Sequence, residues 1–185
     1  MRKLAASFFI TLDGIVGEPQ RWQGPYFDQE MGALLGQRMA SSDGFVLGRK
    51  TYEEWAAFWP HQGSDNPMAA AMTQTSKYVA STTLTTVEWE NSTLLDGDVT
   101  QAVADLKREP GGDLQTSGST TLVRHLLAAN LVDELRLMVH PLVVGDGRRL
   151  FERGDDHRLE LVDTTTLSTG VIAMTYALVP PAQQR

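Results

Sequence analysis

Short apolar runs and longer segments with helical spacing alternate along the chain. Residues 4–10 and 45–47 are apolar and rich in aromatic or β-branched side chains, which is typical of buried strands. Residues 28–40 instead repeat apolar side chains every three or four positions, as one face of a helix does. The alternation of the two patterns predicts an α/β domain.

The same patterns predict the remaining elements. Helices are predicted at residues 51–58, 68–75, 99–109 and 118–129, and strands at 77–81, one or two within 84–95, one from 113, and one running through Pro141. A glycine-rich loop covers residues 14–25. We expect a single domain over residues 1–179 and a C-terminal tail at 180–185.

Composition narrows the function classes. The chain has 185 residues, of which 42% are hydrophobic and 21% charged, as in a globular protein of ordinary size. Its net charge of −7 disfavours a nucleic-acid partner, because phosphate contacts need a clustered basic face. No apolar run is long enough to span a bilayer. The absence of cysteine excludes disulfides and thiolate catalysis, and the cytoplasm is the expected compartment.

The first stretch with candidate chemistry is a junction between a strand and a helix. The strand at 45–47 runs into Gly48, Arg49, Lys50 and Thr51, which open the next helix. Gly48 would let the backbone approach a ligand, Thr51 would cap the helix, and the two cations would attract phosphate. An ordinary surface turn is the alternative interpretation. Neither GxxxxGK[ST] nor GxGxxG is present, so this is neither a P-loop nor the common dinucleotide fingerprint.

A second junction repeats this arrangement. A strand from residue 113 leads to Gly118, and then Ser119 and Thr120 begin a helix. Hydroxyls and free amide groups at a helix start bind phosphate without formal charge, although simple helix capping explains the same residues. Two such turns at the carboxyl ends of strands would face one ligand from two sides.

The C-terminal half completes a family pattern. Leu-Val-Asp-Glu-Leu at 131–135 leads to Pro141 and to the turn at 145–147, after Thr-Leu-Asp-Gly at 11–14 and Leu-Gly-Arg-Lys-Thr-Tyr-Glu at 47–53 earlier in the chain. With these motifs the chain resembles the superfamily that contains dihydrofolate reductase and the reductase domain of the bifunctional riboflavin-biosynthesis deaminase/reductase. It resembles a stand-alone relative of that reductase domain.

The resemblance implies a three-layer α/β/α fold with a mostly parallel sheet and a C-terminal antiparallel hairpin. It also implies hydride transfer from NADPH to a heterocyclic or ribosylamino substrate, of the riboflavin or the pterin type. Gly48, Arg49, Lys50 and Thr51 would lie along the cofactor's pyrophosphate and adenosine phosphates. Ser81 and Thr82 would lie near the adenosine ribose and its 2′-phosphate, and Gly118, Ser119 and Thr120 would line the other side.

Two aspartates are candidates for the catalytic step. A C=N acceptor needs a proton, and Asp28 stands where dihydrofolate reductases carry their substrate-binding carboxylate. The neighbouring Trp22, Tyr26 and Phe27 would raise its pKa, although Asp28 would also serve as a plain helix cap. Glu30 is an alternative. Asp13 is the second candidate, because the resemblance places it beside the substrate pocket, and an ordinary turn aspartate is the other interpretation.

The histidines and a cluster of arginines are further candidates for a functional site. The four histidines are scattered without metal-binding spacing, so no metal site is expected. A basic cluster is formed by Arg148, Arg149 and Arg153. It would contact a substrate phosphate or, on the simpler interpretation, only solvent.

The resemblance also bears on assembly. Relatives pair through their C-terminal strands, which implies a homodimer, and the apolar segment at 171–179 would suit that interface. A non-catalytic, ligand-binding homodimer is the alternative function.

Overall fold

The computed structural model describes residues 1–63 and 65–179. The α-helices are α1 (Gln29–Ala40), α2 (Arg49–Phe58), α3 (Pro67–Gln74), α4 (Val99–Arg108) and α5 (Thr120–Ala128), with single turns of 3-10 helix at Pro19–Arg21, Gly24–Tyr26 and Trp59–His61. The strands are β1 (Leu4–Thr11), β2 (Ser42–Gly48), β3 (Ser76–Ala80), β4 (Ser92–Leu94), β5 (Asp113–Ser117), β6 (Glu134–His140), β7 (Leu159–Thr166) and β8 (Ile172–Leu178).

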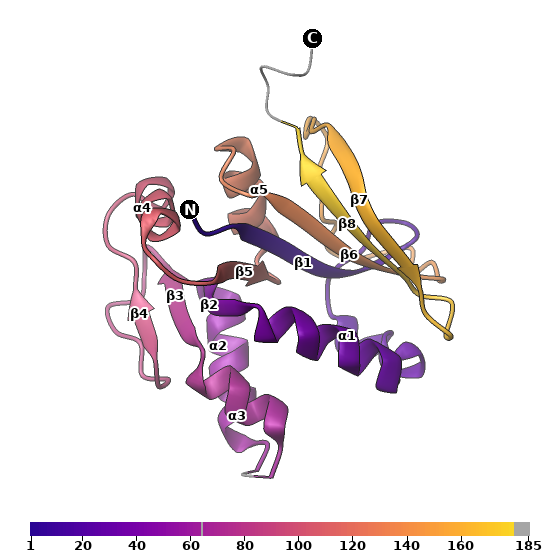
Figure 1. Cartoon of the computed structure of the whole chain (residues 1–185), viewed down its shortest axis with the longest axis horizontal. Helices are drawn as coiled ribbons and strands as arrows, with labels where there is room; N and C mark the ends of the chain where they lie inside the picture. Colours follow the sequence, from indigo (N-terminus) through magenta and orange to yellow (C-terminus); the bar gives the residue numbers. More distant parts are fainter. Residues whose placement is uncertain (64, 180–185) are drawn as a thin grey trace.

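The strands form one eight-stranded sheet in the order β4-β3-β2-β5-β1-β6-β8-β7. From β4 to β6 all neighbours are parallel, whereas β8 runs antiparallel to both β6 and β7. Helices lie on both sides of this sheet (Figure 1). The predicted fold, a three-layer arrangement with a mostly parallel sheet and a C-terminal antiparallel hairpin, is confirmed.

The alternation of side chains along the strands builds a core on each face of the sheet. In β2, Val46 packs toward α4 and α5, and its neighbours Phe45 and Leu47 pack toward α2 and α3. A third cluster around Met31 lies between α1 and the β6–β8 region. Because both faces are covered by helices, the central strands are apolar on both sides.

Polar caps begin three of the helices. The carboxylates of Asp28 and Asp98 accept backbone N–H groups at the starts of α1 and α4, and the Asn66 side chain does so at α3. Pro67 occupies the first turn of α3, where its missing N–H leaves no intrahelical bond unmade. These local signals explain why the predicted helix starts agree with the structure at these three places.

Three expected boundaries are corrected. Helix α2 begins at Arg49 rather than Thr51, because Gly48 is extended and takes the cap position. Within residues 84–95 the structure has one short strand, β4. Strand β6 ends at His140, since the following proline has no N–H to donate to a neighbour. The predicted tail at 180–185 lies outside the described residues.

None of the described helices has the length and apolarity needed to cross a bilayer.

Candidate functional site

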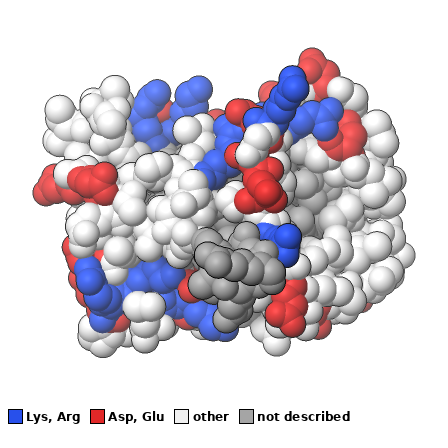
Figure 2. Space-filling model, turned by 90° about the horizontal axis from the view of Figure 1, so that it is seen from above, with Lys and Arg blue, Asp and Glu red and all other residues white. Residues whose placement is uncertain are grey.

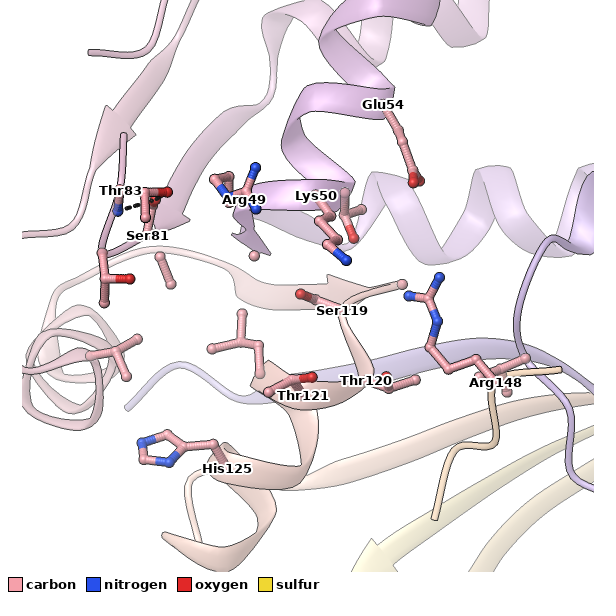
Figure 3. Close-up of a pocket in the computed structure, with 18 of the residues that line it drawn as sticks. Arg49, Lys50, Glu54, Ser81, Thr83, Ser119, Thr120, Thr121, His125 and Arg148 are labelled. Atoms are coloured by element: carbon pink, nitrogen blue, oxygen red, sulfur yellow. Dashed lines mark hydrogen bonds between the residues drawn. The ribbon is translucent and has the colours of Figure 1, made fainter. Parts of the chain in front are cut away.

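A cavity of about 1040 Å³ opens where the parallel strands β2, β3 and β5 end. It lies at the sheet's carboxyl edge, the usual ligand position in open α/β sheets. Figure 3 shows side chains from separate elements directed into this space. Its lining includes every residue predicted to hold a cofactor: Gly48, Arg49, Lys50, Thr51, Ser81, Thr82, Gly118, Ser119 and Thr120.

The two glycine junctions are packed against each other. A Cβ on Gly48 would stand 1.8 Å from the Ser119 Oγ, and one on Gly118 would stand 2.7 Å from the Thr51 Oγ1. Gly118 also has a φ of +82°, which favours glycine. The missing side chain of Gly48 therefore makes room for Ser119 of the opposite junction. Close approach of a ligand to Gly48 stays a prediction. Adjacent strands β2 and β5 bring the two turns this close.

The helix starts in the cavity leave hydrogen-bonding groups available. Among residues 1–63 and 65–179 no side chain caps α2, and Thr51 lies inside the first turn of this helix rather than at the cap position expected for it. Ser119 occupies the cap position of α5, yet its hydroxyl makes no capping hydrogen bond. Simple capping therefore does not account for Ser119. Free N–H groups at a helix start, together with an uncommitted hydroxyl, are suited to an anion.

The charged groups of the cavity have different partners. Arg49 forms an ion pair with Glu53, with 2.9 Å between Nη1 and Oε2. Lys50 makes no ion pair with any residue in 1–63 or 65–179. The Ser81 hydroxyl accepts the backbone N–H groups of Thr83 and Leu84, which fixes the turn after β3. Figure 2 shows that, on the face seen from above, basic groups are interspersed with acidic ones.

Sequence comparison decides the family. The profile of the RibD C-terminal domain matches residues 2–173. The chain belongs to this family. The RibD C-terminal domain protein described here is 27% identical over 180 residues to the uncharacterized protein YyaP of Bacillus subtilis, covering 95% of this chain and 94% of YyaP.

Solved structures share the fold. A Shewanella sp. PV-4 protein, named as a candidate in riboflavin biosynthesis, superimposes with a TM-score of 0.74 at 20% identity, covering 96% of this chain and 99% of the other. Dihydrofolate reductase from Enterococcus faecalis, solved with NADP(H), superimposes with a TM-score of 0.65 at 18% identity over 96% and 97% of the two chains. This RibD C-terminal domain protein therefore has a dihydrofolate reductase-like fold.

Asp28 does not have the environment expected from the sequence. Its Oδ1 accepts the Met31 N–H at 2.9 Å, and its Oδ2 accepts the Ser168 hydroxyl at 3.0 Å. The Met31 hydrogen bond first, and the Ser168 hydrogen bond after it, hold the pKa of Asp28 below its ordinary value. The expectation of a raised pKa is wrong, because Trp22 and Tyr26 pack edge-on against His140 instead.

Asp28 and Glu30 border a separate open depression of about 460 Å³, not the main cavity. Glu30 accepts the Ser168 N–H at 2.8 Å, so both carboxylates connect the start of α1 to the β7–β8 connection. A catalytic role for either carboxylate stays a prediction.

Asp13 connects two loops. Its carboxylate accepts the Thr11 hydroxyl at 2.6 Å and the Gly145 N–H at 2.8 Å. These two hydrogen bonds lower the pKa of Asp13 to about 2. Asp13 is absent from the lining of the main cavity. It joins the turn after β1 to the turn after β6, and its predicted place beside a substrate stays a prediction.

Asp98 and His125 line the main cavity without a role assigned from the sequence. Residues 16–20 of the glycine-rich loop and Arg148 also line it. His125 lies on α5, where its Nε2 is 2.9 Å from the Thr100 hydroxyl at the start of α4. No local motif indicates these positions, because each enters the cavity through the packing of distant segments. Of the basic cluster Arg148, Arg149 and Arg153, the cavity lining includes Arg148 but neither of the other two.

Proposed function

We propose that this protein is an NADPH-dependent reductase that acts on a small heterocyclic or ribosylamino substrate. One observation carries the proposal: both glycine junctions at helix starts and the turn after β3 line a single cavity large enough for a dinucleotide. Membership of the RibD C-terminal domain family and the fold shared with a dihydrofolate reductase that binds NADP(H) support it.

The cavity residues fit the groups of such a cofactor. The free N–H groups at the start of α2 and the uncommitted Ser119 hydroxyl suit the diphosphate. Ser81 and Thr82, at the end of β3, would take the adenosine ribose and its 2′-phosphate. Arg49 supplies positive charge on the same side, and its exposed pair with Glu53 costs little to exchange for a phosphate.

The bound cofactor would supply a hydride, and the protein would orient the acceptor against it. The acceptor nitrogen also needs a proton. Hydrogen bonds lower the pKa of both Asp28 and Asp13, so both are carboxylates at neutral pH. A carboxylate only accepts hydrogen bonds. We propose that Asp28 binds N–H groups of the substrate, and that the proton reaches the acceptor nitrogen from water.

Two substrate types remain in the proposal. One is the 5-amino-6-(5-phosphoribosylamino)uracil type of riboflavin biosynthesis, and the other is a dihydrofolate or pterin.

The second candidate function is ligand binding without turnover. It is favoured by one observation: both candidate carboxylates are committed to hydrogen bonds within the protein.

Titration with NADPH and with NADH, followed by nicotinamide fluorescence, tests the cofactor. We expect tighter binding of NADPH, and we expect Arg49→Ala to weaken NADPH about tenfold or more while changing NADH little, because a charge-assisted contact to the 2′-phosphate is lost. Arg153→Ala removes the same charge at an exposed position outside the cavity and serves as the control.

Turnover separates the two candidate functions. If NADPH binds, its oxidation is measured with ribosylaminopyrimidines and with pterins. Oxidation with either class supports the reductase. Cofactor binding without oxidation by either class favours the non-catalytic alternative, and binding of neither nucleotide contradicts the cofactor assignment.

A further inference from the structure

Arg148 enters the cavity from a wall opposite the glycine junctions. It follows the turn at residues 145–147, and its backbone carbonyl accepts the N–H groups of Val16 at 2.8 Å and Gly17 at 3.2 Å. A Cβ on Gly17 would stand 3.2 Å from the Arg148 Cβ, so the two loops are in close contact. These contacts hold the backbone of Arg148 in place, and its side chain extends into the cavity from there.

Three cationic side chains lie at different places along the cavity. Figure 3 shows Arg49 on the side of Ser81 and Thr83, Lys50 near Ser119, and the guanidinium of Arg148 pointing toward Lys50 from the opposite side. Neither Lys50 nor Arg148 makes an ion pair with another residue that the structure describes. Two unpaired cations from separate elements therefore face the same part of one cavity.

We propose that Lys50 and Arg148 bind one diphosphate between them, namely the diphosphate of a dinucleotide. The inference rests on the proposed cofactor site and adds a residue from the opposite wall. A fork of guanidinium donors and a compact ammonium complement one another around adjacent phosphates. Arg49, further along the cavity, is left for the 2′-phosphate. The two ends of the cavity then recognise different anionic groups.

Three acidic residues also line the cavity. Glu18 pairs with Arg21 at 2.9 Å, and Asp98 accepts the Gln101 N–H at 2.9 Å as the cap of α4. Glu54 is exposed and points into the same part of the cavity as Lys50 in Figure 3. Its charge opposes an anion there. The proposal therefore predicts that Glu54→Gln strengthens diphosphate binding, opposite in sign to the loss of either cation.

The test compares inorganic pyrophosphate, NADH and NADPH at low ionic strength, by calorimetry for pyrophosphate and by fluorescence for the nucleotides. We expect Arg148→Ala to weaken all three ligands by a similar factor of about ten, because all three carry a diphosphate. Arg153→Ala is the matched control and leaves all three unchanged. Arg148→Lys keeps the charge and recovers part of the affinity. Thermal melting confirms that each variant is folded.

Each outcome decides the inference. If Arg148→Ala weakens NADPH alone, Arg148 contacts the 2′-phosphate and the inference is overturned. The inference is also overturned if the variant binds all three ligands as wild type does but has a changed KM for a phosphorylated substrate. If wild type binds pyrophosphate through Arg148 but binds neither nucleotide, the two cations still form a diphosphate site, but a dinucleotide as its ligand and the proposed reductase are both overturned. A double variant with Lys50→Ala should lose less than the sum of the single losses, because both cations contact one group.

Discussion

Single residues in this protein have roles that their neighbours in sequence do not reveal. Lys77 is completely buried, and its ammonium donates to the carbonyls of Met72, Thr73 and Thr75 at the end of α3. It also lies 4.1 Å from the centre of the Trp89 ring. A buried lysine is tolerated here because the helix end offers the carbonyl oxygens that its charge requires.

Asp13 gives a prediction at this scale. Its folded-state pKa of about 2 lies below its ordinary value of 3.8. Between these values the unfolded chain binds more protons, so the carboxylate stabilises the folded state at neutral pH and loses this effect as pH falls from about 4 to about 2. Asp13→Asn should lower stability at pH 7 and flatten the acid dependence in that window.

Urea unfolding of wild type and Asp13→Asn between pH 2 and pH 7 measures the effect. The difference in unfolding midpoint should shrink as the pH approaches 2. Asp156→Asn, at an exposed position, is the control and should follow wild type. A difference that stays constant over the whole pH range would contradict the assigned role of Asp13.

At the scale of elements, the start of α5 packs against the end of β2. Gly48 has a backbone conformation that alanine accepts, with φ of −78°, so a substitution there acts only through contact with Ser119. Gly48→Ala should destabilise the protein by about 1–3 kcal/mol, the usual cost of overpacking. It should also weaken NADPH binding, because both junctions line the cavity that we propose holds the cofactor.

A double-mutant cycle checks this contact. Ser119→Gly removes the side chain that a Cβ at position 48 would meet, and glycine is accepted at a cap position. The double variant should therefore recover most of the stability lost in Gly48→Ala. Gly36→Ala, inside α1 with open space around it, is the control and should stabilise by about 0.5–1 kcal/mol. Additive losses would show that the junctions are not in contact.

At the scale of the whole molecule, the two edges of the sheet differ. One edge is the three-residue strand β4, and the other is the eight-residue strand β7. On β7, Leu161 is 52% exposed and Val162 is 61% exposed. A long edge with exposed apolar side chains readily pairs with another chain. We propose that β7 and β8 form the interface of a homodimer.

Light scattering coupled to size-exclusion chromatography tests the assembly. We expect a dimer for wild type and a monomer for Val162→Lys, since an edge lysine opposes pairing. Val143→Lys, at another exposed apolar position in the loop after β6, should remain dimeric. A monomeric wild type, or a Val162→Lys variant that still dimerises, would exclude this interface.

The sequence by itself determined the α/β class and the approximate positions of most helices and strands up to β6, and it predicts that both glycine junctions bind phosphate. Those features depend on local periodicity, on caps such as Asp28 and Asp98, and on glycines next to strands, all of which lie within a few residues of one another. The family motifs predict the cofactor, and the residues that they assign to it are gathered in one cavity of the structure.

Only the tertiary structure decided which partners those residues meet. The strand order places β2 beside β5, which turns two separate glycines into one interlocked pair. The loop after β6 brings Arg148 into the cavity, and Trp22 and Tyr26 pack against His140. The Asp28 carboxylate, whose pKa the Met31 N–H lowers, also accepts the hydroxyl of the distant Ser168. Local sequence does not contain this information, because these contacts join segments that lie far apart along the chain, such as Gly48 and Ser119 or Trp22 and His140.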